Sequence, residues 1–308
     1  MRQECAICLA SLDSLRRTKL MEDLLVERAL RKSDRVLEIW EASDCDWNQT
    51  LYHLGAYAIG APRNGGQMEE LARRVQYLMC LKERSSLRRV EALLLGCSGL
   101  LNMEFFDDHI VALQDEYEYL AGKYSLSSMH AGVWDRSSLM PAGNPVIRIA
   151  QFAALVAKDE FAVDAIVALR SLEDVERMFS VRASEYWRTR CVPGGKKFEG
   201  SGRIGRQKIH MLAINLVVPL QFAYATVTKN EPLKERALEL LEAIPAEKNR
   251  VVSGWTGYGV ACTSAYDSQA LLELSAKCDR GECAGCPMAK MVGTRVVPPT
   301  NMSEKKEL

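Results

Sequence analysis

Apolar side chains recur every three or four residues along most of this chain, which is the period of an α-helix with one buried face. In residues 14–43, for example, Met21, Leu25, Ala29, Val36 and Trp40 fall on one helical face. Alternation of apolar and polar positions, which marks a half-buried β-strand, never continues beyond four residues. The pattern predicts an all-α protein, an irregular multi-helix array of about ten to twelve helices of typical length.

Residues at the helix boundaries support this prediction. Asp46 and Asp107 each stand just before an apolar helical pattern, where a carboxylate can accept hydrogen bonds from free backbone amides. Ser171 is followed three residues later by Asp174, which resembles a capping box. Pro145 suits the first position of a helix, because that position needs no amide donor.

The most apolar helix is expected at Gly205–Thr228. Its apolar run Met211–Val227 contains polar Gln221 and is short for a bilayer span, so we expect a buried core helix and no membrane association. Pro219 removes an amide donor and crowds the carbonyl of Asn215, which predicts a kink.

The pattern favours one all-α domain over residues 1–298. The irregular stretch 125–144 is the place where this domain could be subdivided. The polar tail 299–308 is expected to be disordered.

Composition indicates the cellular compartment in which the protein works, but it does not indicate the function. Lys plus Arg and Asp plus Glu are both 40, so net charge indicates no partner, and nucleic-acid affinity would need a local basic patch. The ten cysteines are scattered and follow no apolar secretory signal. We therefore expect a reducing cytoplasm, with thiols that are free or metal-bound rather than paired in disulfides.

A cysteine cluster near the C-terminus gives the most defined chemistry. Cys278, Cys283 and Cys286 lie within nine residues, and three thiolates on one turn can share a zinc ion, with an iron–sulfur cluster as the alternative. A structural zinc site normally has four ligands, and Cys5 is the candidate for the fourth. The other candidates for that position are Cys8, Cys262 and His210. The competing interpretation is three free surface thiols.

A basic, glycine-rich loop at 188–208 is the candidate surface for phosphate or nucleic acid. Trp187 and Phe198 could stack on bases. The competing interpretation is a solvated loop without a ligand. The positive residues of the loop are Arg188, Arg190, Lys196, Lys197, Arg203, Arg206 and Lys208.

No nucleophile, base and orienting residue can be assembled from the sequence, because the four histidines are isolated from one another. The prediction therefore leans away from an enzyme. The alternative is an enzyme with a helical cleft near His210, Glu185 and Arg206, and a third class is a purely structural or protein-interaction role.

A set of ordered segments resembles the C-terminal helical portion of a bacterial family, domain-of-unknown-function family 2851. The resemblance implies no established activity. Longer members carry an additional N-terminal region of nuclease-like character, which implies that this chain is the helical companion of a nuclease-like domain. We therefore interpret the chain as a binding or scaffold module with a structural metal site, contacting nucleic acid or such a domain. The matching segments are Leu24–Arg28, Asp46–Tyr52, Glu91–Gly96, Glu116–Tyr117, Arg148–Gln151, Ser184–Trp187, Asn215–Pro219, Pro245–Asn249, Ala265–Leu271 and Cys278–Cys286.

Overall fold

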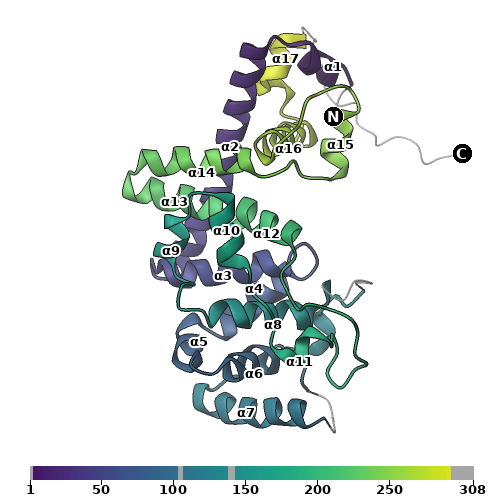
Figure 1. Cartoon of the computed structure of the whole chain (residues 1–308). Helices are drawn as coiled ribbons and strands as arrows, with labels where there is room; N and C mark the ends of the chain where they lie inside the picture. Colours follow the sequence, from purple (N-terminus) through teal and green to yellow (C-terminus); the bar gives the residue numbers. More distant parts are fainter. Residues whose placement is uncertain (1–2, 103–106, 138–142, 293–308) are drawn as a thin grey trace, which may run out of the picture. The chain divides into compact units, whose positions relative to one another are not determined.

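The computed structural model describes residues 3–102, 107–137 and 143–292, and in these ranges every regular element is a helix (Figure 1). Strand-like pairing is limited, in the same ranges, to two isolated bridges, Arg182 with Arg203 and Pro245 with Ser264. The all-α prediction is confirmed. The expected tail 299–308 lies outside the described residues.

The helices run in the following order. The first part of the chain forms α1 (Gln3–Ser11), α2 (Ser14–Ala42), α3 (Trp47–Gly60), α4 (Gly65–Arg74), α5 (Tyr77–Glu83), α6 (Leu87–Cys97), α7 (Asp108–Tyr124) and η1 (Ala131–Val133). The middle forms α8 (Pro145–Val156), α9 (Val163–Ala168), α10 (Leu172–Phe179), α11 (Glu185–Arg188), α12 (Arg206–Leu212), η3 (Ala213–Val217) and α13 (Val218–Thr228). The last part forms α14 (Glu231–Ala243), α15 (Arg250–Thr256), α16 (Ala265–Asp279), η4 (Cys283–Gly285) and α17 (Pro287–Val292). The helices outnumber the ten to twelve expected, because stretches such as 163–190 divide into short helices.

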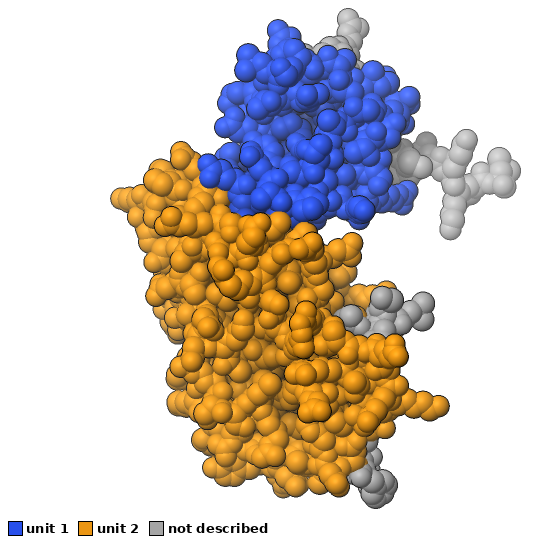
Figure 2. All heavy atoms as spheres, in the orientation of Figure 1, with its two compact units in different colours: residues 1–32, 238–308 blue, residues 33–237 orange. Residues whose placement is uncertain are grey.

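The chain divides into two compact units, residues 1–32 with 238–308 (unit 1) and residues 33–237 (unit 2) (Figure 2). The boundaries fall inside α2 and α14 and not in the stretch 125–144. Each unit is described here by itself.

The core of unit 2 is built where α3 packs on α4 and α8, and α6 packs on α7 and α8. Tyr52 and Phe152 lie at its centre, with ring centroids 5.2 Å apart and at most 1% exposure. The α6–α7 contact needs a glycine, because a Cβ at Gly96 would lie 2.1 Å from Cγ of Tyr117. Removal of these apolar faces from water is the main stabilising contribution to the unit.

The predicted caps are present in unit 2. The Asp46 carboxylate accepts a hydrogen bond from the amide of Asn48 at 2.7 Å. Ser171 and Asp174 form a reciprocal capping box at the start of α10. Pro145 is the first residue of α8. Local sequence therefore specifies where these helices begin.

The apolar helix over residues 206–228 is continuous but not uniform. A π-helical segment, η3, lies between α12 and α13 and immediately precedes Pro219. Such a segment accommodates the missing amide donor of the proline, so the expected distortion takes this form. By length and composition Arg206–Thr228 could cross a membrane, and 67% of its most apolar window is buried inside the protein, as in a core helix.

Unit 1 is organised around α16. Trp255 of α15 is fully buried and donates its indole N–H to Oγ of Ser275 at 2.7 Å, which joins α15 to α16. A capping box between Ser264 and Asp267 begins α16. At the far end of this helix the chain continues through η4 to α17, which packs against α1.

Candidate functional site

A cavity of about 570 Å³ in unit 2 brings polar, charged and aromatic side chains together. They come from the first turn of α7, from α11 and from the loop that follows α11. The lining residues are His109, Ser184, Glu185, Tyr186, Thr189, Arg190 and Lys197. The basic loop predicted from the sequence therefore contributes to the lining of the cavity, through Thr189, Arg190 and Lys197.

Asp107 fixes the geometry of this cavity. Its carboxylate caps α7 by accepting hydrogen bonds from the amides of His109 and Ile110, and it also accepts one from the Tyr186 hydroxyl at 3.0 Å. The Tyr186 ring stacks on the His109 ring, with centroids 4.1 Å apart and planes 11° apart. The Arg190 guanidinium lies over the Tyr186 ring, 4.5 Å from its centroid. One carboxylate thus holds a stack of histidine, tyrosine and arginine.

The charges at the cavity follow from burial and hydrogen bonding. Burial lowers the pKa of His109, so its imidazole is neutral at neutral pH. Burial alone would raise the pKa of Asp107, yet the hydrogen bonds from Tyr186, Ile110 and His109 hold it below the usual value. The cavity therefore has the cations Arg190 and Lys197 in its lining, and an ionised Asp107 hydrogen-bonded to the lining residue Tyr186.

Several buried polar atoms on residues in or near this lining have no geometrically ideal hydrogen-bond partner among the described residues. They are Nε2 of His109, Oγ of Ser184, Nε1 of Trp187 and Oε1 of Glu91, and of these residues His109 and Ser184 line the cavity. Burial raises the pKa of Glu91, which is 1% exposed, to about 7, and the neighbouring Ser184 offsets only part of that shift. Buried polar atoms are normally paired, so this group is unusual in a folded protein.

Three of the seven predicted basic residues are occupied by protein groups. Lys208 is 7% exposed and donates to the carbonyl of Ala61 at 2.6 Å, and burial lowers its pKa to about 7. Arg206 forms an ion pair with Glu176 at 2.9 Å. Arg188 donates to the backbone carbonyl of Ala183 at 3.2 Å. Lys208 is therefore withdrawn from solvent, whereas Arg206 is paired but keeps a side chain that is 76% exposed.

The other four remain accessible in the described part of unit 2. Lys196, Lys197 and Arg203 are exposed and form no ion pair with a described residue. Arg190 lies over Tyr186 and lines the cavity. Of the seven predicted residues, only Arg190 and Lys197 therefore line the cavity.

The two expected stacking residues differ. Trp187 is fully buried and cannot contact a base, whereas Phe198 is half-buried. The aromatic side chain that lines the cavity is that of Tyr186, which was not one of the residues expected to stack on bases.

Two of the three residues of the alternative enzyme site come together, and the third, Glu185, lies elsewhere. His210 and Arg206 both contact Glu176, at 3.3 Å and 2.9 Å. Glu185 instead lines the cavity with His109. The acid that faces His210 is therefore Glu176, which the sequence did not single out.

The cysteines expected to bind metal meet in unit 1. Burial raises the pKa of Cys278, at the end of α16, and the nearby thiols of Cys286, Cys5 and Cys283 raise it further. The four thiols are thus electrostatic neighbours although Cys5 lies on α1. In this arrangement no three or more His, Cys, Asp or Glu side chains of the described residues are set to hold a metal ion, so the cysteine knuckle is not confirmed.

The other candidates for the fourth ligand differ in their surroundings. Burial raises the pKa of Cys262 to about 11, and the nearby carboxylates of Asp267 and Glu247 contribute to this rise. Cys8 is half-buried on α1. His210 belongs to unit 2. Of the four candidates for the fourth ligand, Cys5 is the one that raises the pKa of Cys278.

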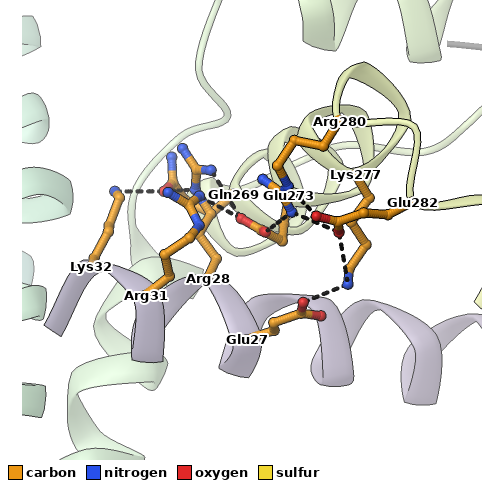
Figure 3. Close-up of polar contacts among 9 residues, drawn as sticks. All are labelled: Glu27, Arg28, Arg31, Lys32, Gln269, Glu273, Lys277, Arg280 and Glu282. Carbon is orange, nitrogen blue, oxygen red and sulfur yellow. Dashed lines mark hydrogen bonds and ion pairs between the residues drawn. The ribbon is translucent and has the colours of Figure 1, made fainter. Parts of the chain in front are cut away.

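A network of charges joins α2 to α16 within unit 1 (Figure 3). Glu273 is fully buried and accepts hydrogen bonds from Arg31 at 2.5 Å and from Arg28 and Arg280 at 3.4 Å. Gln269, one turn earlier, accepts from Nε of Arg28 at 2.7 Å. The network thus positions the helix that ends at the thiols.

The network continues on both sides of Glu273. Lys32 donates to Oε1 of Gln269 at 2.7 Å, and burial lowers its pKa to about 7. Toward the thiols, Lys277 pairs with Glu27 at 2.5 Å, and Arg280 pairs with Glu282 at the same distance. Figure 3 shows these side chains in one continuous row between the two helices.

Comparison with known proteins places the chain in a family without adding a function. The sequence model of a family described as "Protein of unknown function (DUF2851)" matches residues 2–250, which confirms the resemblance. The matched range ends before the last two segments that carry the resemblance, Ala265–Leu271 and Cys278–Cys286. No curated protein and no solved structure matches the chain.

Proposed function

This chain belongs to the DUF2851 family of proteins of unknown function, and we propose that it is a non-enzymatic module that binds nucleic acid through unit 2. The observation that carries the proposal is the group of cations on the loop that follows α11. Lys196, Lys197 and Arg203 are exposed and form no ion pair with a described residue, and Arg190 lies over the Tyr186 ring.

Cations of this kind favour contact with phosphates. A Lys or Arg that neutralises a phosphate releases condensed counterions, so binding weakens steeply as salt rises. The net charge of the chain is zero, so the attraction must be local to this surface. Exposed Glu185 and Glu199 reduce the local charge without forming ion pairs with these cations.

The test is titration of labelled single-stranded and duplex DNA at several salt concentrations. The triple variant Lys196→Glu, Lys197→Glu, Arg203→Glu should bind at least about tenfold more weakly at low salt and show a smaller salt slope. The matched control is Lys82→Glu, an exposed lysine on α5. Absence of binding by the native chain at low salt, or equal binding by the triple variant, would contradict the proposal.

The same proposal includes a structural metal in unit 1. Four thiols that influence one another electrostatically, from α1, α16, η4 and the start of α17, are the support for it. Thiolates suit zinc, with an iron–sulfur cluster as the alternative, and the metal would tie the two ends of unit 1 together. Closing around an ion would require small movements of the thiols from the arrangement described above.

Metal analysis and an absorption spectrum of anaerobically purified protein test this part. Zinc would give one metal per chain without colour, and an iron–sulfur cluster would give visible absorption. Cys5→Ser should lower the metal content as strongly as Cys283→Ser. The control is Cys45→Ser, at an exposed cysteine in the turn after α2, which should leave the metal content unchanged. Less than about 0.2 metal per chain would end the metal proposal.

A nuclease-like domain is the second partner in this proposal. The support for it is the resemblance to longer family members, not a feature of either unit. Co-purification of the chain with such a domain, supplied separately, is the direct measurement. Lack of association at micromolar concentrations would leave nucleic acid as the proposed partner.

A further inference from the structure

The cavity under the basic loop has the size and composition of a small-molecule site. Its volume of about 570 Å³ lies within the range of typical ligand pockets. Such pockets combine aromatic walls with a few placed polar groups. The walls here are the rings of His109 and Tyr186, and the polar groups include Ser184, Arg190 and Lys197.

One lining residue carries a buried polar atom without a partner among the described residues. Nε2 of His109 is buried and makes no hydrogen bond to them. Burial without a partner costs free energy, which a bond to this atom would recover. The neighbouring Ser184, also in the lining, already lowers the pKa of Glu91 by hydrogen bonding to it.

The cations determine the charge of the ligand. Arg190 is ordered over Tyr186, which leaves its N–H groups available for two oxygens of one phosphate. Lys197 supplies a second positive charge from the other side of the loop. The loop itself is fastened to the wall, because the amide of Gly194 donates to the Tyr186 hydroxyl at 3.0 Å. A phosphate is the group that this arrangement suits.

The remaining lining suits a base and sugar. The Tyr186 ring is stacked with His109 and covered by Arg190, so the planar group considered for a base is the Arg190 guanidinium, since nucleobases stack on guanidinium planes. Glu185 also lines the cavity and would repel a second phosphate, but it can accept a hydrogen bond from a sugar hydroxyl or a base amine.

From this geometry we infer that the cavity holds one nucleoside monophosphate unit, with its phosphate on Arg190 and Lys197. The inference rests on the proposed nucleic-acid binding and deepens it. The unit can come from two sources, a free mononucleotide or the 5′-phosphorylated end of a single strand. In the second case the exposed Lys196 and Arg203 contact the rest of the strand.

The experiment compares ligands that differ only at this group. Calorimetry with free mononucleotides measures the first source. Titration of single strands of about 12 nucleotides, with and without a 5′-phosphate, measures the second. The 5′-phosphorylated strand should bind at least tenfold more tightly, and Ser184→Ala or Arg190→Lys should abolish that difference.

Two matched variants separate the inference from the proposed function. Lys196→Glu with Arg203→Glu should weaken long strands but leave free mononucleotide binding, and Lys82→Gln should change neither. Arg190→Lys keeps the positive charge. A melting temperature equal to that of the native chain will show that this variant keeps its fold.

Equal binding of both strands together with no mononucleotide binding overturns the inference. If the strands still bind with a salt dependence, the proposed function survives that result. Mononucleotide binding without any strand binding supports the inference with the free mononucleotide as its source, and it overturns the proposed function.

Discussion

Tyr186 stacks on His109 at a centroid separation of 4.1 Å, although 77 positions separate them in the chain (186 minus 109). Asp107 connects the two, because it caps the helix that carries His109 and accepts a hydrogen bond from the Tyr186 hydroxyl. A helix start and a short helix far along the chain thus form one wall of the cavity.

Removal of the Tyr186 hydroxyl should loosen the loop over the cavity. Tyr186→Phe keeps the stack but deletes the bonds to Asp107 and Gly194. We expect a loss of about 1 kcal/mol in unfolding free energy and faster proteolysis within residues 191–200. Urea unfolding and limited proteolysis measure both effects. Tyr119→Phe, at an exposed tyrosine, is the control, and the same cleavage rate in both variants would contradict the prediction.

Glu91 should make stability depend on pH. Its pKa is about 7 in the folded protein against a usual 4.5. Between these values the unfolded chain ionises while the folded protein keeps its proton, so stability falls as pH rises toward 7 and is constant above it. A shift of this size corresponds to about 3 kcal/mol.

The variant Glu91→Gln should not show this loss. Its advantage over the native chain should therefore be larger at pH 8 than at pH 5, by about 2–3 kcal/mol. Urea unfolding at the two pH values measures the difference. Glu118→Gln, at an exposed glutamate of α7, controls for the change in charge. An equal advantage at both pH values would show that Glu91 is ionised in the folded protein.

Glu273 should be the most sensitive residue of the network in unit 1. Glu273→Ala leaves Arg28 and Arg31 without their common acceptor. Breaking a buried pair typically costs about 3–5 kcal/mol, and we expect roughly 2–3 because Arg31 is half-exposed. Chemical denaturation measures the loss, and Glu239→Ala, at an exposed glutamate, should be nearly neutral. Similar losses in both variants would contradict a buried network.

Two glycines near the α6–α7 contact should respond oppositely to alanine. Gly96→Ala places a methyl group 2.1 Å from the Tyr117 ring and should destabilise unit 2 by about 1–3 kcal/mol. At Gly122 of α7 a Cβ meets nothing within 4 Å, so Gly122→Ala should stabilise the helix by up to about 1 kcal/mol. Thermal unfolding of both variants tests the packing, and a shift of the same sign would contradict it.

The sequence predicted the helices well where the signals are local. Asp46, Ser171 with Asp174, and Pro145 begin helices as expected, because a cap bonds to amides within its own first turn. Cavity residues were harder to predict. Asp107 was identified only as a helix start, and His109 only as one of four isolated histidines, since neither carries a signal for Tyr186.

The basic loop shows what spacing alone cannot decide. Seven cations were predicted from it, and the fold turns Lys208 toward the carbonyl of Ala61 and pairs Arg206 with Glu176. Both partners lie at least 30 positions away in sequence. Trp187 was expected to stack on bases, but the fold buries it completely and places Tyr186 in the cavity lining.

By itself the sequence determined the all-α class, the helix starts and the presence of three neighbouring thiols, since these depend on period, capping and spacing within a few residues. The tertiary structure decided which cations face solvent, that Cys5 approaches Cys278, and that His109 meets Tyr186. These relationships depend on contacts between distant segments, which form only when the helices bury their apolar faces against one another.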